Sequence, residues 1–281
     1  MRFLNPSNLH EALTLLSKFP DCKILAGGTD VCVQLRGGGL KPKAILNIWG
    51  LNELKNIRDE GRYITIGALS THTDIIRSPL IHKHIPVLAK ACRTIGAVQV
   101  QNRGTIGGNV MNASPAGDTL PVLMAYAADV EVTSIAGQRW VPFEGFFTGY
   151  RATVVRPGEM VTGFRIAWPP RGERADFIKI GSRKAITISK VMACFRARIE
   201  HKKIVGISIA FGSVAPVPLR LKQTEAFLMG RVLTHKTIDE AVNKLASDIT
   251  PINDIRSTAD YRRHCCGVFL RRFLLESLCV S

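Results

Sequence analysis

Apolar residues near the start of the chain recur at helical spacing and then gather into short runs. The stretch from Leu9 to Leu16 places its apolar residues on one helical face, and Asn8 with Glu11 forms a capping box at its start. This pattern predicts a helix that ends by Pro20. The runs that follow predict two strands, at 23–25 and 44–48. The chain is therefore expected to open with a compact α/β unit.

Strand and helix patterns alternate from residue 60 to residue 170. Strands are predicted over 63–67, 129–135, 138–143 and 160–167, and helices over 71–77, 86–95 and 120–127. The segment from Gln99 to Asp118 differs, because it is rich in Gly, Asn, Ser and Ala and has little apolar periodicity. A twenty-residue irregular stretch inside a compact domain is either functional or a mistaken assignment. The segment is therefore expected to contribute to a site, unless it contains an element that its pattern does not reveal.

Pro169 and Pro170, with the polar residues 171–174 behind them, are the best candidate for a linker between two domains. Beyond them, strands are predicted over 177–180, 191–200 and 204–212, and helices over 221–229, 237–249 and 261–278. The expected fold class is α+β. A two-part α/β domain would occupy residues 1–170, with subdomains of about 1–58 and 59–170, and a C-terminal domain with an antiparallel sheet plus helices would occupy residues 175–281.

The composition adds a strong positive charge to this picture. Of 281 residues, 46% are hydrophobic, which allows a substantial core, while 38 Lys and Arg against 22 Asp and Glu give a net charge of +16. Residues 171–281 carry much of the excess, with 20 basic and 10 acidic side chains. Such a balance indicates a polyanion, an acidic partner protein or an anionic ligand.

Seven cysteines are scattered along the chain without a CxxC pair, which indicates free thiols in a reducing compartment. Charged residues interrupt the N-terminal twenty positions, and no stretch approaches the ~20 apolar residues of a membrane helix. We therefore expect a cytoplasmic protein that does not contact a membrane. The segment His82-Lys83-His84 alone has a spacing that could suit a metal, and an ordinary solvated turn explains it more simply, so no metal site is predicted.

Two glycine-rich loops carry the candidate chemistry, because GxGxxG, GxxxxGK[ST], HExxH and GxSxG motifs are all absent. The first loop is AGGTD, from Ala26 to Asp30, and the second is TIGGN, from Thr105 to Asn109. Each Gly-Gly pair removes Cβ atoms, so that backbone amides can approach an anion closely. Two such loops in one domain suit a ligand with two phosphates, although each loop alone is also compatible with an ordinary turn.

The two loops, with ASPAGD following the second at 113–118, resemble the paired FAD-binding signatures of the flavin subunit of molybdenum hydroxylases. That family includes xanthine dehydrogenase and carbon monoxide dehydrogenase. The similarity continues nearly end to end, through FFTGYRAT at 146–153, IKIGSRKAITISKV at 178–191, SIAFGSVAPVPLR at 208–220 and YRRH at 261–264. The resemblance implies a PCMH-type FAD-binding domain followed by a flavoprotein C-terminal domain. The pair Thr29-Asp30 is closer to the xanthine dehydrogenase type.

Carried over position by position, the family pattern implies FAD contacts at Lys23, Ile24, Leu25, Ala26, Gly27, Gly28, Thr29, Asp30, Thr105, Ile106, Gly107, Gly108, Asn109, Asp118, Val161 and Lys179. The loops would hold the pyrophosphate and the adjoining ribose or ribityl. Asp118 would lie toward the adenosine part, or could simply cap the following helix, and Val161 would line the flavin. Lys179 would lie near the isoalloxazine, where a cation raises the flavin potential. Without the family pattern, Lys179 would be a surface lysine on a strand.

The resemblance also implies a function for the whole chain, with no catalytic acid or base in it. Substrate would be hydroxylated at molybdopterin in a large partner subunit, and electrons would pass through iron-sulfur clusters in a small one. FAD in this chain would deliver them to NAD or another acceptor, in an assembly expected to be a dimer of heterotrimers. Two alternatives stay open. One is a free-standing flavin-dependent oxidoreductase. The other is a basic nucleic-acid-binding protein, which is disfavoured because only 7% of residues are aromatic and the basic residues are spread along helices.

Overall fold

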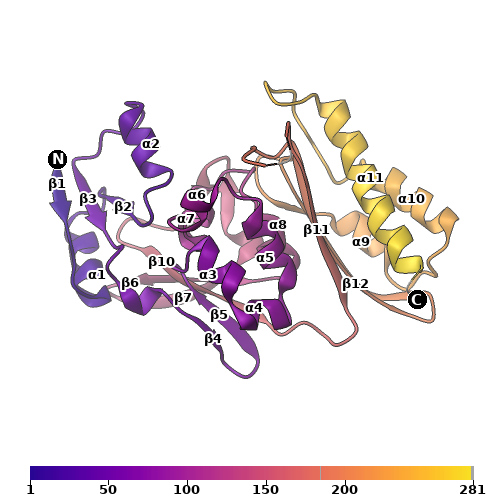
Figure 1. Cartoon of the computed structure of the whole chain (residues 1–281), viewed down its shortest axis with the longest axis horizontal. Helices are drawn as coiled ribbons and strands as arrows, with labels where there is room; N and C mark the ends of the chain where they lie inside the picture. Colours follow the sequence, from indigo (N-terminus) through magenta and orange to yellow (C-terminus); the bar gives the residue numbers. More distant parts are fainter. Residues whose placement is uncertain (184, 280–281) are drawn as a thin grey trace.

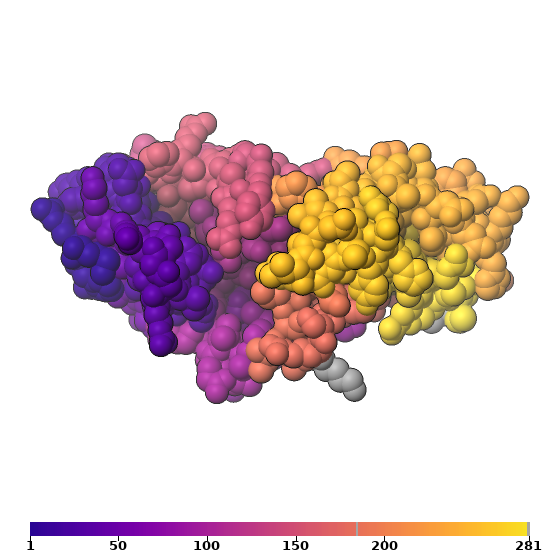
Figure 2. Space-filling model, turned by 90° about the horizontal axis from the view of Figure 1, so that it is seen from above, coloured from indigo at the N-terminus to yellow at the C-terminus, as the bar shows by residue number. Residues whose placement is uncertain are grey.

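A computed structural model describes residues 1–183 and 185–279. The molecule is elongated, with the N-terminal residues at one end and the C-terminal helices at the other (Figures 1 and 2). Three sheets follow one another along this axis, and a two-stranded ribbon accompanies the middle one. None of the described helices combines the length and apolar composition needed to cross a bilayer.

The first sheet is parallel and has the strand order β1-β3-β2. Its elements are β1 (Arg2–Leu4), α1 (Leu9–Lys18), β2 (Lys23–Leu25), α2 (Val31–Arg36) and β3 (Ala44–Asn47). As predicted, the Asn8 side chain caps α1 by accepting a hydrogen bond from the Glu11 amide, but the predicted capping box is incomplete because the Glu11 carboxylate accepts from Ser7 instead of the Asn8 amide. The apolar face of α1 packs on Leu46 of the central strand, in a small core that also includes Leu69 and Met160. Strand β2 therefore ends at the sheet edge and delivers the first glycine loop there.

The second sheet is antiparallel and has the order β4-β5-β10-β6-β7. Its strands are β4 (Ile57–Asp59), β5 (Tyr63–Gly67), β6 (Asp129–Ser134), β7 (Gly137–Pro142) and β10 (Met160–Ala167). Between β5 and β6 the chain forms α3 (His72–Arg77), α4 (Pro79–His84), α5 (Pro86–Arg93), α6 (Val98–Gln101), α7 (Ile106–Met111) and α8 (Leu120–Ala125). Two short 3-10 turns, η1 (Asn52–Leu54) and η2 (Phe143–Gly145), and the ribbon of β8 (Phe147–Gly149) and β9 (Ala152–Thr153) complete this part.

The third sheet is an antiparallel meander with the order β11-β12-β13-β14. It comprises β11 (Arg174–Ile180), β12 (Val191–Glu200), β13 (Lys203–Gly212) and β14 (Leu219–Arg220), and is followed by α9 (Lys222–Leu228), α10 (His235–Leu245) and α11 (Ala259–Leu278). The helices α9–α11 cover one face, whereas α5 and α8 lie against the other (Figure 1). Alternate residues of β12 thus enter two cores: Phe195 packs with the C-terminal helices and Cys194 with the N-terminal domain.

The predicted fold class is confirmed, and one local prediction is wrong. The segment from Gln99 to Asp118 is not irregular throughout, because it contains part of α6 and all of α7. Helix α7 forms despite its glycines because Thr105 caps it by accepting a hydrogen bond from the Gly108 amide. The predicted linker is shorter than expected, because Arg174 already belongs to β11. The two domains share a packed interface rather than a flexible connection.

Candidate cofactor-binding site

A cleft of about 530 Å³ lies between the first sheet and the helices of the second. Twelve of the predicted positions line it: Lys23, Ile24, Ala26, Gly27, Gly28, Thr29, Asp30, Thr105, Gly107, Gly108, Asn109 and Val161. Four predicted positions do not: Leu25, Ile106, Asp118 and Lys179. Of these, Ile106 is fully buried in the core. The cleft volume lies within the range of about 300–1,000 Å³ that small-molecule and cofactor sites occupy.

The first glycine loop presents a row of free backbone donors. Within the described chain, none of the amide groups from residue 27 to residue 30 donates a hydrogen bond. Gly28 has a φ of +80°, a left-handed conformation that glycine adopts without strain. Consecutive free amides around a left-handed residue form a concave anion site. This loop therefore fits the phosphate-binding role that its sequence predicted.

The second glycine loop differs from the first in how its amides are used. Four of its five amide groups donate inside the chain: that of Ile106 to Ser70, that of Gly107 to Ala68, and those of residues 108 and 109 to Thr105. The Thr105 amide donates to no group of the described residues. A Cβ on Gly107 would lie 2.7 Å from the Ala68 carbonyl oxygen, so this glycine allows close packing of the chain on itself. The loop forms a wall of the cleft, to which it contributes side chains and at most the amide of Thr105.

Two basic and two acidic side chains line the cleft. Lys23 and Arg151 have no acidic partner among the residues that the structure describes. Of the acidic pair, Glu159 is neutralised by a 2.7 Å ion pair with Arg139, and Asp30 accepts a hydrogen bond from the Gln34 side-chain amide. Apolar side chains complete the walls, among them Ile48, Leu69, Ile95, Met160 and Val161. A cleft with free amides and cations beside apolar walls fits a ligand with a diphosphate and flat rings.

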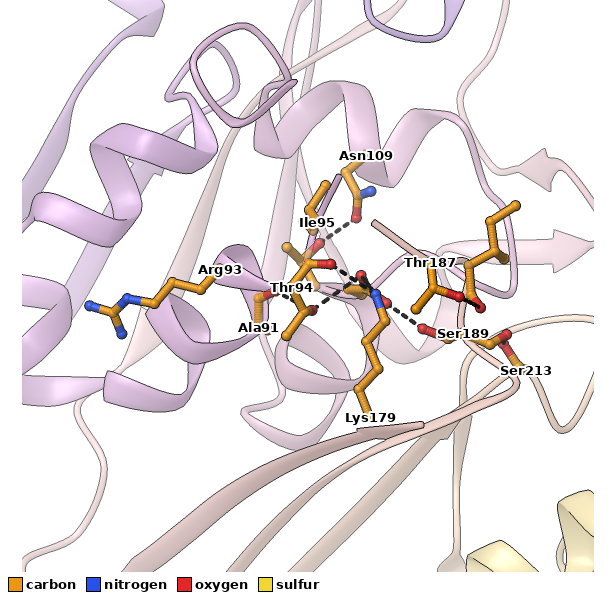
Figure 3. Close-up of polar contacts among 12 residues, drawn as sticks. Ala91, Arg93, Thr94, Ile95, Asn109, Lys179, Thr187, Ser189 and Ser213 are labelled. Atoms are coloured by element: carbon orange, nitrogen blue, oxygen red, sulfur yellow. Dashed lines mark hydrogen bonds and ion pairs between the residues drawn. The ribbon is translucent and has the colours of Figure 1, made fainter. Parts of the chain in front are cut away.

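Asp118 and Lys179 form a buried ion pair outside this cleft. Their Oδ2 and Nζ atoms are 2.5 Å apart, and the side chains are 7% and 8% exposed. Lys179 also donates to the Thr94 carbonyl oxygen, while Asp118 accepts from Ser189 Oγ at 2.6 Å and from Thr94 Oγ1 at 3.2 Å. Figure 3 shows Lys179 extending toward Thr94, with Ser189 approaching the same point from the other side. Burial raises the pKa of Asp118, and Lys179 opposes that rise.

This contact bears on two expectations. Asp118 was expected near the adenosine and Lys179 near the isoalloxazine, whereas their polar atoms lie 2.5 Å apart. The two charged groups therefore lie at one point, and the part of the cofactor that each approaches stays a prediction. Lys179 and Thr94 line a second cavity of about 460 Å³, and Ile95, next in the chain, lines the first cleft. The pair thus lies just beyond the wall of the cleft, where the two domains meet.

Two lining residues had no signal in the sequence. His72 and Gly104 lie side by side because the segments 70–72 and 104–106 pair as a short antiparallel bridge between Thr71 and Thr105. Neither belongs to a glycine pair or to a recognisable motif. Only the pairing of two segments distant in the chain reveals them.

Comparison with known proteins decides the family. The model of the FAD binding domain in molybdopterin dehydrogenase matches residues 1–169, and that of the CO dehydrogenase flavoprotein C-terminal domain matches residues 176–277. The chain belongs to this flavin-subunit family. The resemblance predicted from the sequence is thereby confirmed, and with it FAD as the cofactor of this chain and its class as an oxidoreductase subunit.

Individual relatives of the flavin-subunit family match along almost the whole chain. The nicotinate dehydrogenase FAD-subunit of Eubacterium barkeri is 32% identical over 97% of this chain and 94% of its own. A putative xanthine dehydrogenase FAD-binding subunit of Escherichia coli is 28% identical over 98% and 95%. The solved carbon monoxide dehydrogenase of Hydrogenophaga pseudoflava has a chain that superposes with a TM-score of 0.93 at 30% identity, over 97% of this chain and 95% of its own. The named substrates differ, whereas the flavin subunit keeps its fold.

Proposed function

We propose that this chain is the electron-transfer subunit of a larger molybdenum hydroxylase. A large partner subunit with molybdopterin would oxidise the substrate, and a small partner with iron-sulfur clusters would supply electrons to this chain. Bound FAD supplies the two-electron chemistry that connects those clusters to NAD or another acceptor. The protein's own residues then bind and orient the cofactor, and none is required as a general acid or base.

The row of free amides at residues 27–30 is the observation that carries this proposal. They would hold the diphosphate, with Lys23 and Arg151 supplying positive charge. The loop from Thr105 to Asn109 would form the opposite wall, and Val161 would line the flavin. Lys179 would approach the isoalloxazine from the second cavity, with Asp118 holding its ammonium in place.

Two further parts of the proposal concern the setting of the chain. A cytoplasmic location is supported by its seven cysteines, all of which are free thiols in the described structure. A dimer of heterotrimers is the assembly proposed for the complete enzyme. The medium chains of carbon monoxide dehydrogenases to which this chain is similar are, by that name, parts of larger enzymes.

A matched pair of glycine variants tests the phosphate loop. Gly28 and Gly38 both have a left-handed backbone, with φ of +80° and +73°, and Gly38 has open space around it. An alanine at either position should cost about 1–2 kcal/mol of folding stability through backbone strain. Only Gly28→Ala should also raise the dissociation constant for FAD, by tenfold or more, because it distorts the free amides. Equal FAD affinity in both variants, measured by flavin fluorescence, would remove the loop from the site.

Co-purification tests the role in an assembly. The chain, expressed together with the products of its neighbouring genes, should elute as a complex that contains FAD, iron, sulfide and molybdenum. The isolated chain should bind one FAD and oxidise no substrate by itself. A stable monomer with turnover of its own would instead establish the free-standing flavin oxidoreductase.

A further inference from the structure

His72 is a buried histidine in the wall of the cleft, with no role in the family pattern described above. It is the first residue of α3, and the residue is only 2% exposed. Its amide donates to the Gly104 carbonyl oxygen at 3.0 Å, which holds it beside the second glycine loop. Gly104 makes room for the ring, because a Cβ there would lie 3.0 Å from His72 Cδ2 and 3.2 Å from Nε2.

The ring nitrogen Nδ1 has a defined partner. Cys92 Sγ lies 3.6 Å from it, and Cys92 is fully buried. Burial raises the pKa of the Cys92 thiol, so the sulfur keeps its proton and can donate a hydrogen bond to Nδ1. Burial also lowers the pKa of His72 to about 4, so the ring is neutral at pH 7 and carries one proton. With Nδ1 acting as an acceptor, that proton resides on Nε2.

The other nitrogen, Nε2, opens into the cleft. Among the described residues it has no hydrogen-bond partner. Two side-chain nitrogens of the described residues, His84 Nε2 and Arg262 Nε, are both unpartnered and shielded from solvent. His72 Nε2 is also unpartnered but is not shielded in this way, so it is accessible to solvent. Since His72 lines the cleft, the space that Nε2 reaches is the cleft itself.

The free nitrogen lies next to the phosphate loop. A Cβ on Gly27 would meet Arg103 O at 1.6 Å and Gly104 N at 3.2 Å, so Gly27 packs directly on the residue that flanks the His72 ring. The free amides that begin at Gly27 and the donor of His72 therefore face the same region. An anion held by those amides has a further acceptor oxygen available for a neutral N–H donor.

We infer that His72 binds the cofactor directly, by donating a hydrogen bond from Nε2 to a phosphate oxygen of its diphosphate. This assignment rests on the proposed function of the cleft as the FAD site. A neutral donor suits this position because it adds a directed hydrogen bond without placing a further charge in the buried wall of the cleft. Cys92 has a positioning role, since its thiol selects the ring tautomer.

Flavin titration of the full-length, flavin-free chain tests the inference. His72→Phe keeps a flat ring but has no donor. It should raise the dissociation constant for FAD by roughly 10- to 100-fold, which is the change expected when one hydrogen bond to a charged group is lost. His72→Gln, whose side-chain amide retains an N–H, should stay within about fivefold of the unmodified protein. His235→Phe, at an exposed histidine of α10, is the matched control and should have no effect.

Simpler ligands identify the acceptor. ADP contains the diphosphate, whereas riboflavin contains no phosphate, so His72→Phe should weaken ADP binding and leave riboflavin binding unchanged. Weaker riboflavin binding with unchanged ADP binding would overturn the assignment of the phosphate as the acceptor. Equal FAD affinity of His72→Phe and the unmodified protein would overturn the inference as a whole. If the unmodified protein itself fails to bind FAD, the proposed function fails instead.

Nitrogen NMR of the histidine rings gives a second readout that does not depend on any variant folding. The unmodified protein should carry the His72 ring proton on Nε2, and that proton should shift when FAD or ADP is added. A ring proton on Nδ1 in the bound state would contradict the inference, because Nε2 would then be an acceptor facing a phosphate oxygen.

Discussion

The two adjacent glycines of the phosphate loop, Gly27 and Gly28, are required for different reasons. At Gly27 a Cβ would lie 1.6 Å from the Arg103 carbonyl oxygen, so the residue allows one part of the chain to pack on another. At Gly28 the backbone itself is left-handed, with φ of +80°. The first glycine therefore fixes where the loop lies and the second fixes which way its amides point.

The buried pair of Asp118 and Lys179 is the other decisive feature at this scale. Because its members are 7% and 8% exposed, removing either partner leaves an unpaired charge in the interior. Such a loss costs about 3–5 kcal/mol. The pair also reduces the net charge that Lys179 presents to a flavin, since its ammonium is already matched by a carboxylate 2.5 Å away.

A double-mutant cycle separates the stability of this pair from its effect on the flavin. Lys179→Met should lower the free energy of unfolding by about 3 kcal/mol, and Lys179→Met with Asp118→Asn should recover most of it. The flavin potential should fall in Lys179→Met by roughly 30 mV or more, about 1.4 kcal/mol for two electrons, because Asp118 is left without its cation. The fall should be smaller in the double variant, because a neutral pair is then removed as a whole. Urea unfolding and redox titration measure the two quantities. An unchanged potential in Lys179→Met would place Lys179 away from the isoalloxazine.

Among the elements, β12 and α8 connect the two domains. Arg196 of β12 forms two hydrogen bonds with the Glu173 carboxylate, at 2.7 and 2.9 Å, and donates to the Ala125 carbonyl oxygen at the end of α8. Its guanidinium also lies 4.0 Å from the ring centroid of Tyr126. One side chain thus joins the domain connection, the last turn of α8 and the third sheet.

Arg196→Ala should therefore lower the free energy of unfolding by about 3 kcal/mol, because it leaves the Glu173 carboxylate buried without its partner. Arg198→Ala is the matched control on the same strand. Its ion pair with Glu200 is 3.4 Å long and exposed on both sides, so the loss should stay below about 0.5 kcal/mol. Chemical denaturation of the two variants compares them directly. Similar losses in both would mean that the domain junction does not depend on Arg196.

The whole molecule carries its charge unevenly. In residues 171–281 most acidic side chains are already in ion pairs within the chain, for example Glu225 with Arg220 and Glu276 with Arg174. The 20 basic side chains of this part outnumber its 10 acidic ones, so the surplus lies on the surface of the C-terminal domain. A bound FAD offsets only about two charges, and the expected target of the remainder is an acidic surface on a partner subunit.

Salt should therefore weaken the association of this chain with its partners. Raising sodium chloride from about 0.1 M to about 1 M shortens the screening length from about 10 Å to about 3 Å, and the dissociation constant should rise at least tenfold. An uncharged osmolyte at matched osmolality is the control and should have little effect. A dissociation constant that does not respond to salt would mean that the surplus charge is simply solvated.

Much of the architecture follows from local patterns. The 3.6-residue and 2-residue periodicities predicted α1, β10, β12 and α11 nearly at their observed positions, because an element that buries one face must repeat apolar residues at its own period. The expectation failed at α7, where an N-cap and contacts to Ser70 and Ala68 stabilise a helix in a segment rich in glycine. Propensity is a weak preference that tertiary contacts override.

The sequence by itself determined the elements, the family and the two loops that make a dinucleotide site recognisable, because these depend on residues close together in the chain. Only the tertiary structure decided which loop has a row of free amides, that Asp118 and Lys179 form one buried ion pair, and that His72 lines the cleft. Each of these depends on which distant groups satisfy a donor or compensate a charge. A hydrogen bond or a buried ion pair is made across space, and its partners carry no mark in the local pattern.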